Sequence, residues 1–194
     1  MKKLHVVCAV AILALAAMVL IGCDQPTSNP GNNPSNPATS NPGNNPSNPG
    51  DSWTKVETVD GLEGVWKSSV TQAFSGDQIT VVTTITYPTT EGNLTWAFEV
   101  KDMPGRGEEK LFPKDTIGTV LKNGQMPVSI FKTSGYMEVN ADKTKLKVTA
   151  TLKEDDSSWE DAKAVVAGGT FEGDMKITSE PTQITVEQYY TKQK

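Results

Sequence analysis

The sequence predicts a mainly β protein, an antiparallel up-and-down meander of about eight or nine strands with one short helix. Apolar and polar residues alternate with a period of two along several segments, turn signals separate those segments, and a single segment has helical spacing. Closing such a meander as a soluble barrel removes its exposed strand edges, and an open sandwich is the alternative.

The alternation is clearest in the segments 77–88, 93–102 and 145–153. In each of them apolar side chains occupy one face, while Thr, Lys or Glu occupy the other, which is typical of a strand with one face buried. The polar outer faces predict a barrel in water rather than one in a membrane. The full set of expected strands is 64–74, 77–88, 93–102, 117–122, 127–132, 135–141, 145–153, 169–178 and 183–191.

Short turn signals such as Asn123-Gly124 and Ser134-Gly135 separate the expected strands. The segment 103–115 is expected to be a longer loop, either covering a barrel mouth or merely connecting two strands. One helix is expected over 157–167. The sequence Ser157-Ser158-Trp159-Glu160 is typical of a capping box, and Gly168-Gly169 provides a stop.

The amino terminus has the pattern of an export signal. A short basic segment, Met1 to His5, precedes an apolar run from Val6 to Gly22 that carries no charge. The run ends in Leu20-Ile21-Gly22-Cys23, which resembles the lipobox of bacterial lipoproteins. This resemblance implies that residues 1–22 are a signal peptide removed from the mature chain, and that Cys23 carries covalent acyl lipid.

The lipid would anchor the protein to a membrane of the bacterial cell envelope, because two or three acyl chains exceed the threshold of marginal binding. The outer membrane or cell surface is favoured, with the inner membrane as the alternative. Residues 23–51 are expected to form the lipidated cysteine and a disordered tether. The decapeptide Ser28–Pro37 recurs as Ser40–Pro49, and it offers no apolar side chain to bury. Residues 52–194 have the length of one domain.

Composition limits the chemistry of that domain. The chain has a net charge of -5, and about −7 without Lys2 and Lys3; Arg106 is its single arginine. No basic patch is present, so no nucleic-acid partner is expected. The one histidine and both cysteines precede residue 24. We therefore expect no catalytic residue, no metal site and no cofactor other than the lipid on Cys23.

The motif Gly64-Val65-Trp66 resembles the start of the first barrel strand in lipocalin-like domains. The resemblance implies structural roles, with Gly64 permitting close chain approach and Trp66 closing one barrel end. Lipocalins often place an arginine over this tryptophan. Here Arg106 lies in the expected loop, and the last strand offers only Lys192.

Six inward-facing side chains are candidates to line a ligand pocket. An eight-stranded barrel is just wide enough for side chains to fill it or for one small ligand. We expect a non-catalytic module that binds a small hydrophobic ligand. The alternative is a structural or adhesive surface lipoprotein that contacts another protein through its loops and has a filled barrel. The pocket candidates are Ile79, Val81, Trp96, Phe98, Val148 and Met175.

One apparent catalytic motif is interpreted as a coincidence. Ser129 and Lys132 match the S-x-x-K pattern of some serine enzymes. That chemistry needs both side chains on one helical face, whereas an expected strand over 127–132 points residues three apart to opposite faces.

Overall fold

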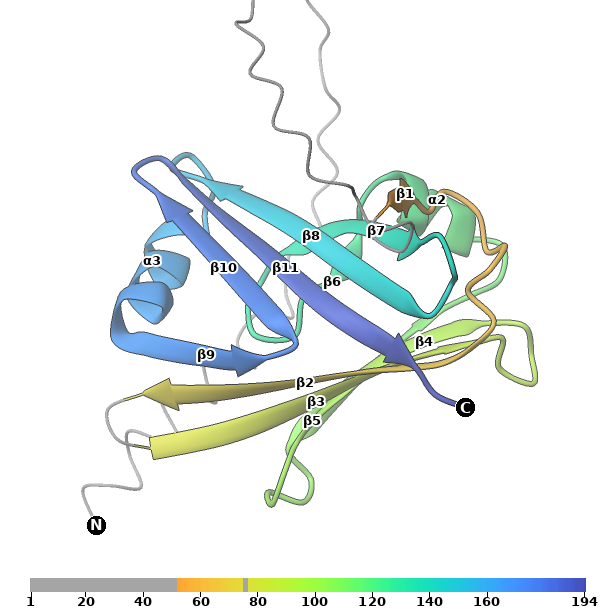
Figure 1. Cartoon of the computed structure of the whole chain (residues 1–194), viewed down its shortest axis with the longest axis horizontal. Coiled ribbons are helices and arrows are strands. Elements are labelled where there is room, and N and C mark those ends of the chain that lie inside the picture. The colour runs from red at the N-terminus through yellow and green to blue at the C-terminus, as the bar shows by residue number, and fades with distance from the viewer. Residues whose placement is uncertain (1–51, 75–76) are drawn as a thin grey trace, which may run out of the picture.

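The protein folds as an antiparallel, mainly β structure whose sheet curls into a half-barrel (Figure 1). The computed structural model describes residues 52–74 and 77–194. The predicted signal peptide, Cys23 and the tether lie outside the described residues. Of the described helices, neither is long and apolar enough to cross a membrane.

The mainly β, antiparallel prediction is confirmed, with more strands than the sequence pattern indicated. The strands are β1 (Trp53–Lys55), β2 (Gly64–Phe74), β3 (Asp77–Tyr87), β4 (Leu94–Val100), β5 (Gly107–Phe112), β6 (Met126–Pro127), β7 (Ser134–Asn140), β8 (Lys145–Lys153), β9 (Gly169–Gly173), β10 (Met175–Glu180) and β11 (Gln183–Lys192). The helices are α2 (Ile117–Lys122) and α3 (Trp159–Gly168).

The sheet runs in the order β1-β7-β8-β11-β2-β3-β4-β5, so its two ends, β1 and β5, are not paired with each other. In Figure 1, β2 to β5 form one wall and β7, β8, β11 and β10 form the other, with α3 at one end and α2 beside β1 at the other. This arrangement corresponds to the open alternative predicted from the sequence, and not to a closed barrel. It leaves part of the half-barrel interior to be filled by other segments.

The predicted strand over 117–122 is wrong, because this segment is the helix α2. Its β-branched residues suggested a strand. However, Ile117 and Leu121 are four residues apart, and both are fully buried. In a strand, Thr119 would share the buried face with these two residues, but Thr119 is exposed. In a helix, Ile117 and Leu121 share one face and Thr119 points away from it.

Three other boundaries differ from the prediction. The expected strand over 127–132 is reduced to the pair Met126–Pro127, because proline has no N–H for a ladder and the chain then bends inward. The expected loop over 103–115 contains β5, a charged edge strand paired with β4. Helix α3 begins after Ser158, whose side chain makes no capping hydrogen bond, so the predicted capping box is wrong.

The predicted strand over 169–178 is two strands, because the chain changes partner at Gly173. Before this residue β9 pairs with β2, and after it β10 pairs with β11. Gly173 has φ +92, and a Cβ there would overlap the Ser69 carbonyl oxygen, so the corner requires glycine. Asp174 then joins both walls: its carboxylate accepts from the Ser69 N–H at 2.8 Å, and its carbonyl accepts from the Tyr189 N–H at 2.8 Å.

The inner faces of the strands form the core, as their alternation predicted. Along β8 every second residue, from Leu146 to Leu152, is buried. Burial of such apolar surface contributes roughly 25 cal/mol per Å², and it is the main force that holds the curved sheet together.

Trp66 fills the end of the half-barrel that lies away from α3. Its ring is fully buried, and its Nε1 donates to the Leu62 carbonyl at 2.8 Å. The Nζ atom of Lys192 lies 5.0 Å from the ring centroid, within the range of a cation–π contact. A Cβ on Gly64 would lie 2.9 Å from Lys192 Cε. Lys192 of the last strand therefore lies over this tryptophan, and Gly64 makes room for it.

We predict that two glycine substitutions change stability in opposite directions. A Cβ on Gly135 would overlap the backbone of Thr149 in the neighbouring strand β8, so Gly135→Ala should lower the free energy of unfolding by about 2 kcal/mol. Gly118 is exposed in α2 with no atom within 4 Å of a Cβ, so Gly118→Ala should raise it by about 0.5–1 kcal/mol. Urea denaturation followed by circular dichroism measures both. Equal effects would contradict the described β7–β8 register.

Candidate ligand-binding cleft

A cleft lies at the α3 end of the half-barrel, between the helix and the inner faces of β2, β3 and β4. Its volume is ≈ 260 Å³. The third side is the segment 129–132, which follows β6 and turns into the interior. Most of its walls are apolar, formed by Phe74, Ile79, Val81, Phe98, Val100, Met103, Ile130, Phe131, Leu152, Ala162, Ala164 and Val165.

The predicted pocket residues divide into two groups. Ile79, Val81 and Phe98 line the cleft. The side chains of Trp96, Val148 and Met175 do not line it, and they pack within the core instead. The division follows position along the strands. Residues near the α3 end face the cleft, whereas residues nearer Trp66 are covered by the core.

Trp96 belongs to the filled part of the interior. Its ring packs edge-on against Phe98, with ring centroids 5.6 Å apart. Its indole Nε1 is buried without a hydrogen-bond partner among the described residues, as is the hydroxyl of Tyr190. Burial raises the pKa of the Tyr190 phenol, which stays neutral at physiological pH. This end of the half-barrel is therefore closed around its own side chains.

The Gln188 amide fixes the segment that forms the third side of the cleft. Gln188 is fully buried on the inner face of β11. Its Oε1 accepts from the Ser129 N–H at 3.0 Å. Its Nε2 donates to Ser68 Oγ at 3.1 Å and to Thr83 Oγ1 at 3.2 Å. A buried amide with three partners holds strands β11, β2 and β3 and the inward-turned segment in one arrangement.

A second glutamine, Gln72, lies on the wall of the cleft itself. It is on the inner face of β2, two residues after the fully buried Val70, and only 4% of its surface is exposed. Its amide forms no hydrogen bond with another described residue and is not among the polar groups sealed from solvent, so it reaches the space of the cleft. Sequence reasoning missed both glutamines. Following the period of two along β2 from Trp66 would have placed Ser68 and Gln72 on the inner face.

Four charged side chains line the mouth of the cleft, and all four are exposed. They are Asp77, Arg106, Lys132 and Asp161. None of them forms an ion pair with another described residue. Two are acidic and two are basic, so their formal charges cancel. The electrostatic field at the mouth therefore does not strongly favour a ligand of either sign.

The S-x-x-K pair does not lie on the expected strand, because Ser129 and Lys132 are in a bend after β6. Both residues line the cleft. The Ser129 hydroxyl is buried without a hydrogen-bond partner among the described residues, so Lys132 does not hydrogen-bond to it. The two residues are not arranged as a nucleophile and its base. Within the described part of the chain, no group of three Asp, Glu, His or Cys side chains could hold a metal ion.

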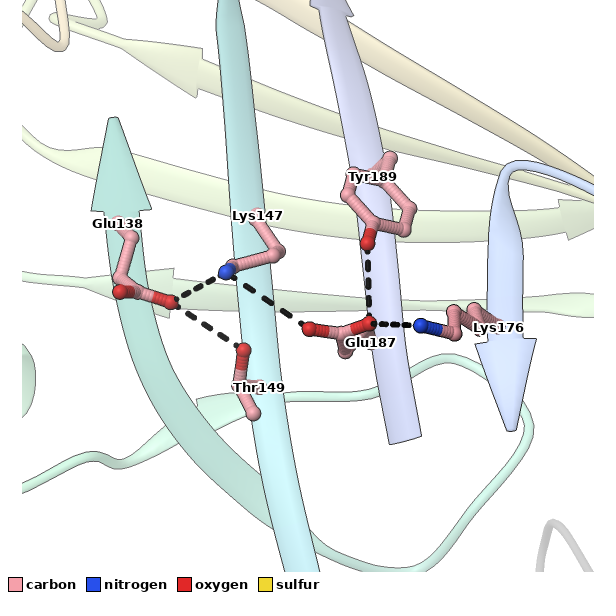
Figure 2. A network of polar contacts seen from close by, with 6 residues as sticks. All are labelled: Glu138, Lys147, Thr149, Lys176, Glu187 and Tyr189. Carbon is pink, nitrogen blue, oxygen red and sulfur yellow. Dashed lines mark hydrogen bonds and ion pairs between the residues drawn. The ribbon is translucent and has the colours of Figure 1, made fainter. Parts of the chain in front are cut away.

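The outer face of the sheet carries a separate polar network across β7, β8, β11 and β10 (Figure 2). Lys147 lies at its centre, 2.9 Å from Glu138 Oε2 and 3.7 Å from Glu187 Oε1. Lys176 approaches the other oxygen of Glu187 at 3.8 Å, and the Tyr189 hydroxyl donates to that oxygen at 3.0 Å. The four charged groups of this network are thus paired within the protein.

Trp53, which follows the expected tether, packs against the same network. Strand β1 pairs with β7, with Trp53 opposite Asn140. The Trp53 ring lies 6.0 Å from the Tyr189 ring and 4.8 Å from Lys147 Nζ. These contacts attach the beginning of the described structure to the outer face of the sheet.

Comparison with protein-family models, with curated proteins and with solved structures found no match for this chain.

The Tyr189 phenol provides a pH-dependent prediction. Burial, then the hydrogen bond to Glu187 and the negative charges of Glu187 and Glu138, raise its pKa from 10.0 to about 12. Folding therefore favours the neutral phenol, and this stabilisation is complete below pH 10 and lost as the pH rises through 12. Tyr189→Phe should reduce the alkaline loss of stability between those values, as measured by thermal unfolding. An unchanged pH profile would contradict the prediction.

Proposed function

We propose that this protein is a non-catalytic lipoprotein of the bacterial envelope, anchored by acyl lipid on Cys23, whose domain binds a small hydrophobic ligand. The observation that supports ligand binding is the apolar cleft of ≈ 260 Å³ between α3 and the inner faces of β2 to β4. Ligand sites are typically apolar hollows with a few polar groups on their walls. This cleft has that composition, and Gln72 is its buried polar group.

The size of the cleft indicates a small ligand. An apolar cavity of about 150 Å³ is sufficient for benzene. Sites for drug-sized molecules are roughly 300–1,000 Å³. A volume of ≈ 260 Å³ lies between these values, so the ligand would be larger than a single ring and smaller than an intact diacyl lipid.

Helix α3 is the wall most suited to admit a ligand. Of its residues only Trp159 and Ala162 are buried, while Val165 is half-buried against the cleft. An element with few buried side chains opens at a lower free energy than the strands of the core. The helix would shift outward on entry, whereas the sheet would remain fixed.

The alternative is a structural or adhesive lipoprotein with a filled barrel that contacts a protein through its loops. It is favoured by the closed packing around Trp66 and by the inward segment held by Gln188. The packing around Trp66 lies at the end of the half-barrel away from α3, and the segment held by Gln188 forms one side of the cleft without filling it. They leave the cleft unexplained, and ligand binding is therefore preferred.

We predict that filling the cleft abolishes ligand binding. Val165→Trp would place an indole where a ligand would lie, whereas Val166→Trp changes a neighbouring half-buried valine that does not line the cleft. The chain from Asp24 onward contains every described residue and the whole core, and circular dichroism can verify its fold. Native mass spectrometry after incubation with an envelope lipid extract, restricted to molecules smaller than a diacyl lipid, should detect bound ligand in the unmodified chain and in V166W, but not in V165W. Equal occupancy in both variants, or an empty unmodified chain, would favour the filled-barrel alternative.

We predict that Cys23→Ser prevents both lipidation and processing. In bacteria supplied with labelled palmitate, the unmodified protein should incorporate the label and lose residues 1–22, because the thiol of Cys23 is the acceptor that the lipobox resemblance implies. The C23S variant should carry no label and keep those residues, as determined by intact mass. Cys8→Ser is the matched control and should be labelled normally. Labelled C23S protein would disprove the assignment of the anchor.

A further inference from the structure

Building on the proposed function, we infer that the cleft selects an uncharged amphiphile, an apolar body with one hydroxyl or amide group that pairs with Gln72. The inference rests on the different states of two inward-facing glutamines. Gln188 uses both ends of its amide within the protein, in three hydrogen bonds. Gln72 is 4% exposed, its amide forms no hydrogen bond with another described residue, and the amide is not among the polar groups sealed from solvent, so it is open to a ligand in the cleft.

The position of Gln72 directs its amide toward the cleft. Along β2 the inward residues run from Trp66 to Phe74 at every second position, and Gln72 is one of them. Its neighbours on the wall, Phe74 and Ile79, are apolar, and Ile79 lies opposite it in the β2–β3 register. A ligand polar group placed beside Gln72 would therefore find no other buried side-chain partner on this part of the wall.

Hydrogen-bond chemistry then limits the class of ligand. A ligand that covers the Gln72 amide without pairing with it removes the amide from water at a cost in free energy, and a ligand group that pairs with the amide avoids this cost. The glutamine amide both donates and accepts, so it matches a primary amide or an alcohol. A hydrocarbon leaves it unpaired. A carboxylate can only accept, and it loses hydration on entering an apolar cleft.

The mouth supports an uncharged ligand for a second reason. Arg106 and Lys132 could attract an anionic headgroup, but Asp77 and Asp161 line the same mouth. Because these four formal charges cancel and all four side chains are exposed, solvent screens them and the attraction for an anion is weak. The Gln72 amide should therefore affect the choice of ligand more than the four charged side chains at the mouth do.

The test uses four ligands that share an aromatic body and differ in their polar group: ethylbenzene, 2-phenylethanol, 3-phenylpropanamide and 3-phenylpropanoate. Binding to the chain from Asp24 onward is measured by calorimetry or by NMR titration. The amide and the alcohol should bind about tenfold more tightly than ethylbenzene and the carboxylate. Equal affinity for the amide and ethylbenzene, or tightest binding of the carboxylate, would overturn the inference.

Two variants assign the selectivity to Gln72. Gln72→Leu should abolish the preference for the amide while keeping the affinity for ethylbenzene. Gln78→Leu is the matched control and should keep the preference, because Gln78 is exposed on β3 and does not line the cleft. If Q72L does not fold, the four-ligand comparison in the unmodified chain still decides.

Failure of the inference is distinguishable from failure of the proposed function. Binding of all four ligands with similar affinity, abolished by V165W, would retain a hydrophobic site and remove the selectivity. Absence of binding by any of the four and by envelope lipid would remove the site itself, and the inference with it.

Discussion

The Gln188 amide is the interaction on which the interior of this protein depends. It lies on β11, the strand between β8 and β2 in the sheet order. From there it fixes Ser68 and Thr83 on the opposite wall and the backbone of Ser129 between the walls. A sheet whose end strands do not pair must fill its open interior with other chain segments. The polar network specifies which segment enters and in what position, because a displaced Ser129 would leave a buried amide oxygen unpaired.

The two ends of the half-barrel consequently differ. At the Trp66 end the sheet strands β2 and β11 pair directly, through Trp66 and Lys192, and the core is continuous. Beyond Asp174 the two strands diverge, and β9, β10 and α3 occupy the space between and beyond them. Divergence of the walls produces a volume that the short, sparsely buried helix does not fill. The cleft is thus a consequence of where the sheet stops pairing with itself.

Local patterns predicted the strands well because burial of one face imposes a period of two on each of them. The faces of β3, β4 and β8 followed directly from residues such as Val81, Trp96 and Leu146. Helix α2 was not predicted, since six residues allow both a helical and a strand interpretation. The corner at Gly173 was also missed, because a change of partner leaves no periodic signal. The two glutamines were overlooked because polar residues were assigned to outer faces, whereas burial depends on position as well as on residue type.

The way the described structure begins has a mechanical consequence. Strand β1 pairs with β7 over three residues, from Trp53 opposite Asn140 to Lys55 opposite Glu138, and no residue of either strand lines the cleft. A pull on the chain from its amino-terminal side would load this short edge strand first. Peeling it away would release about 10 Å of chain. Separation of β1 from β7 would therefore leave both the cleft and the Gln188 network in place.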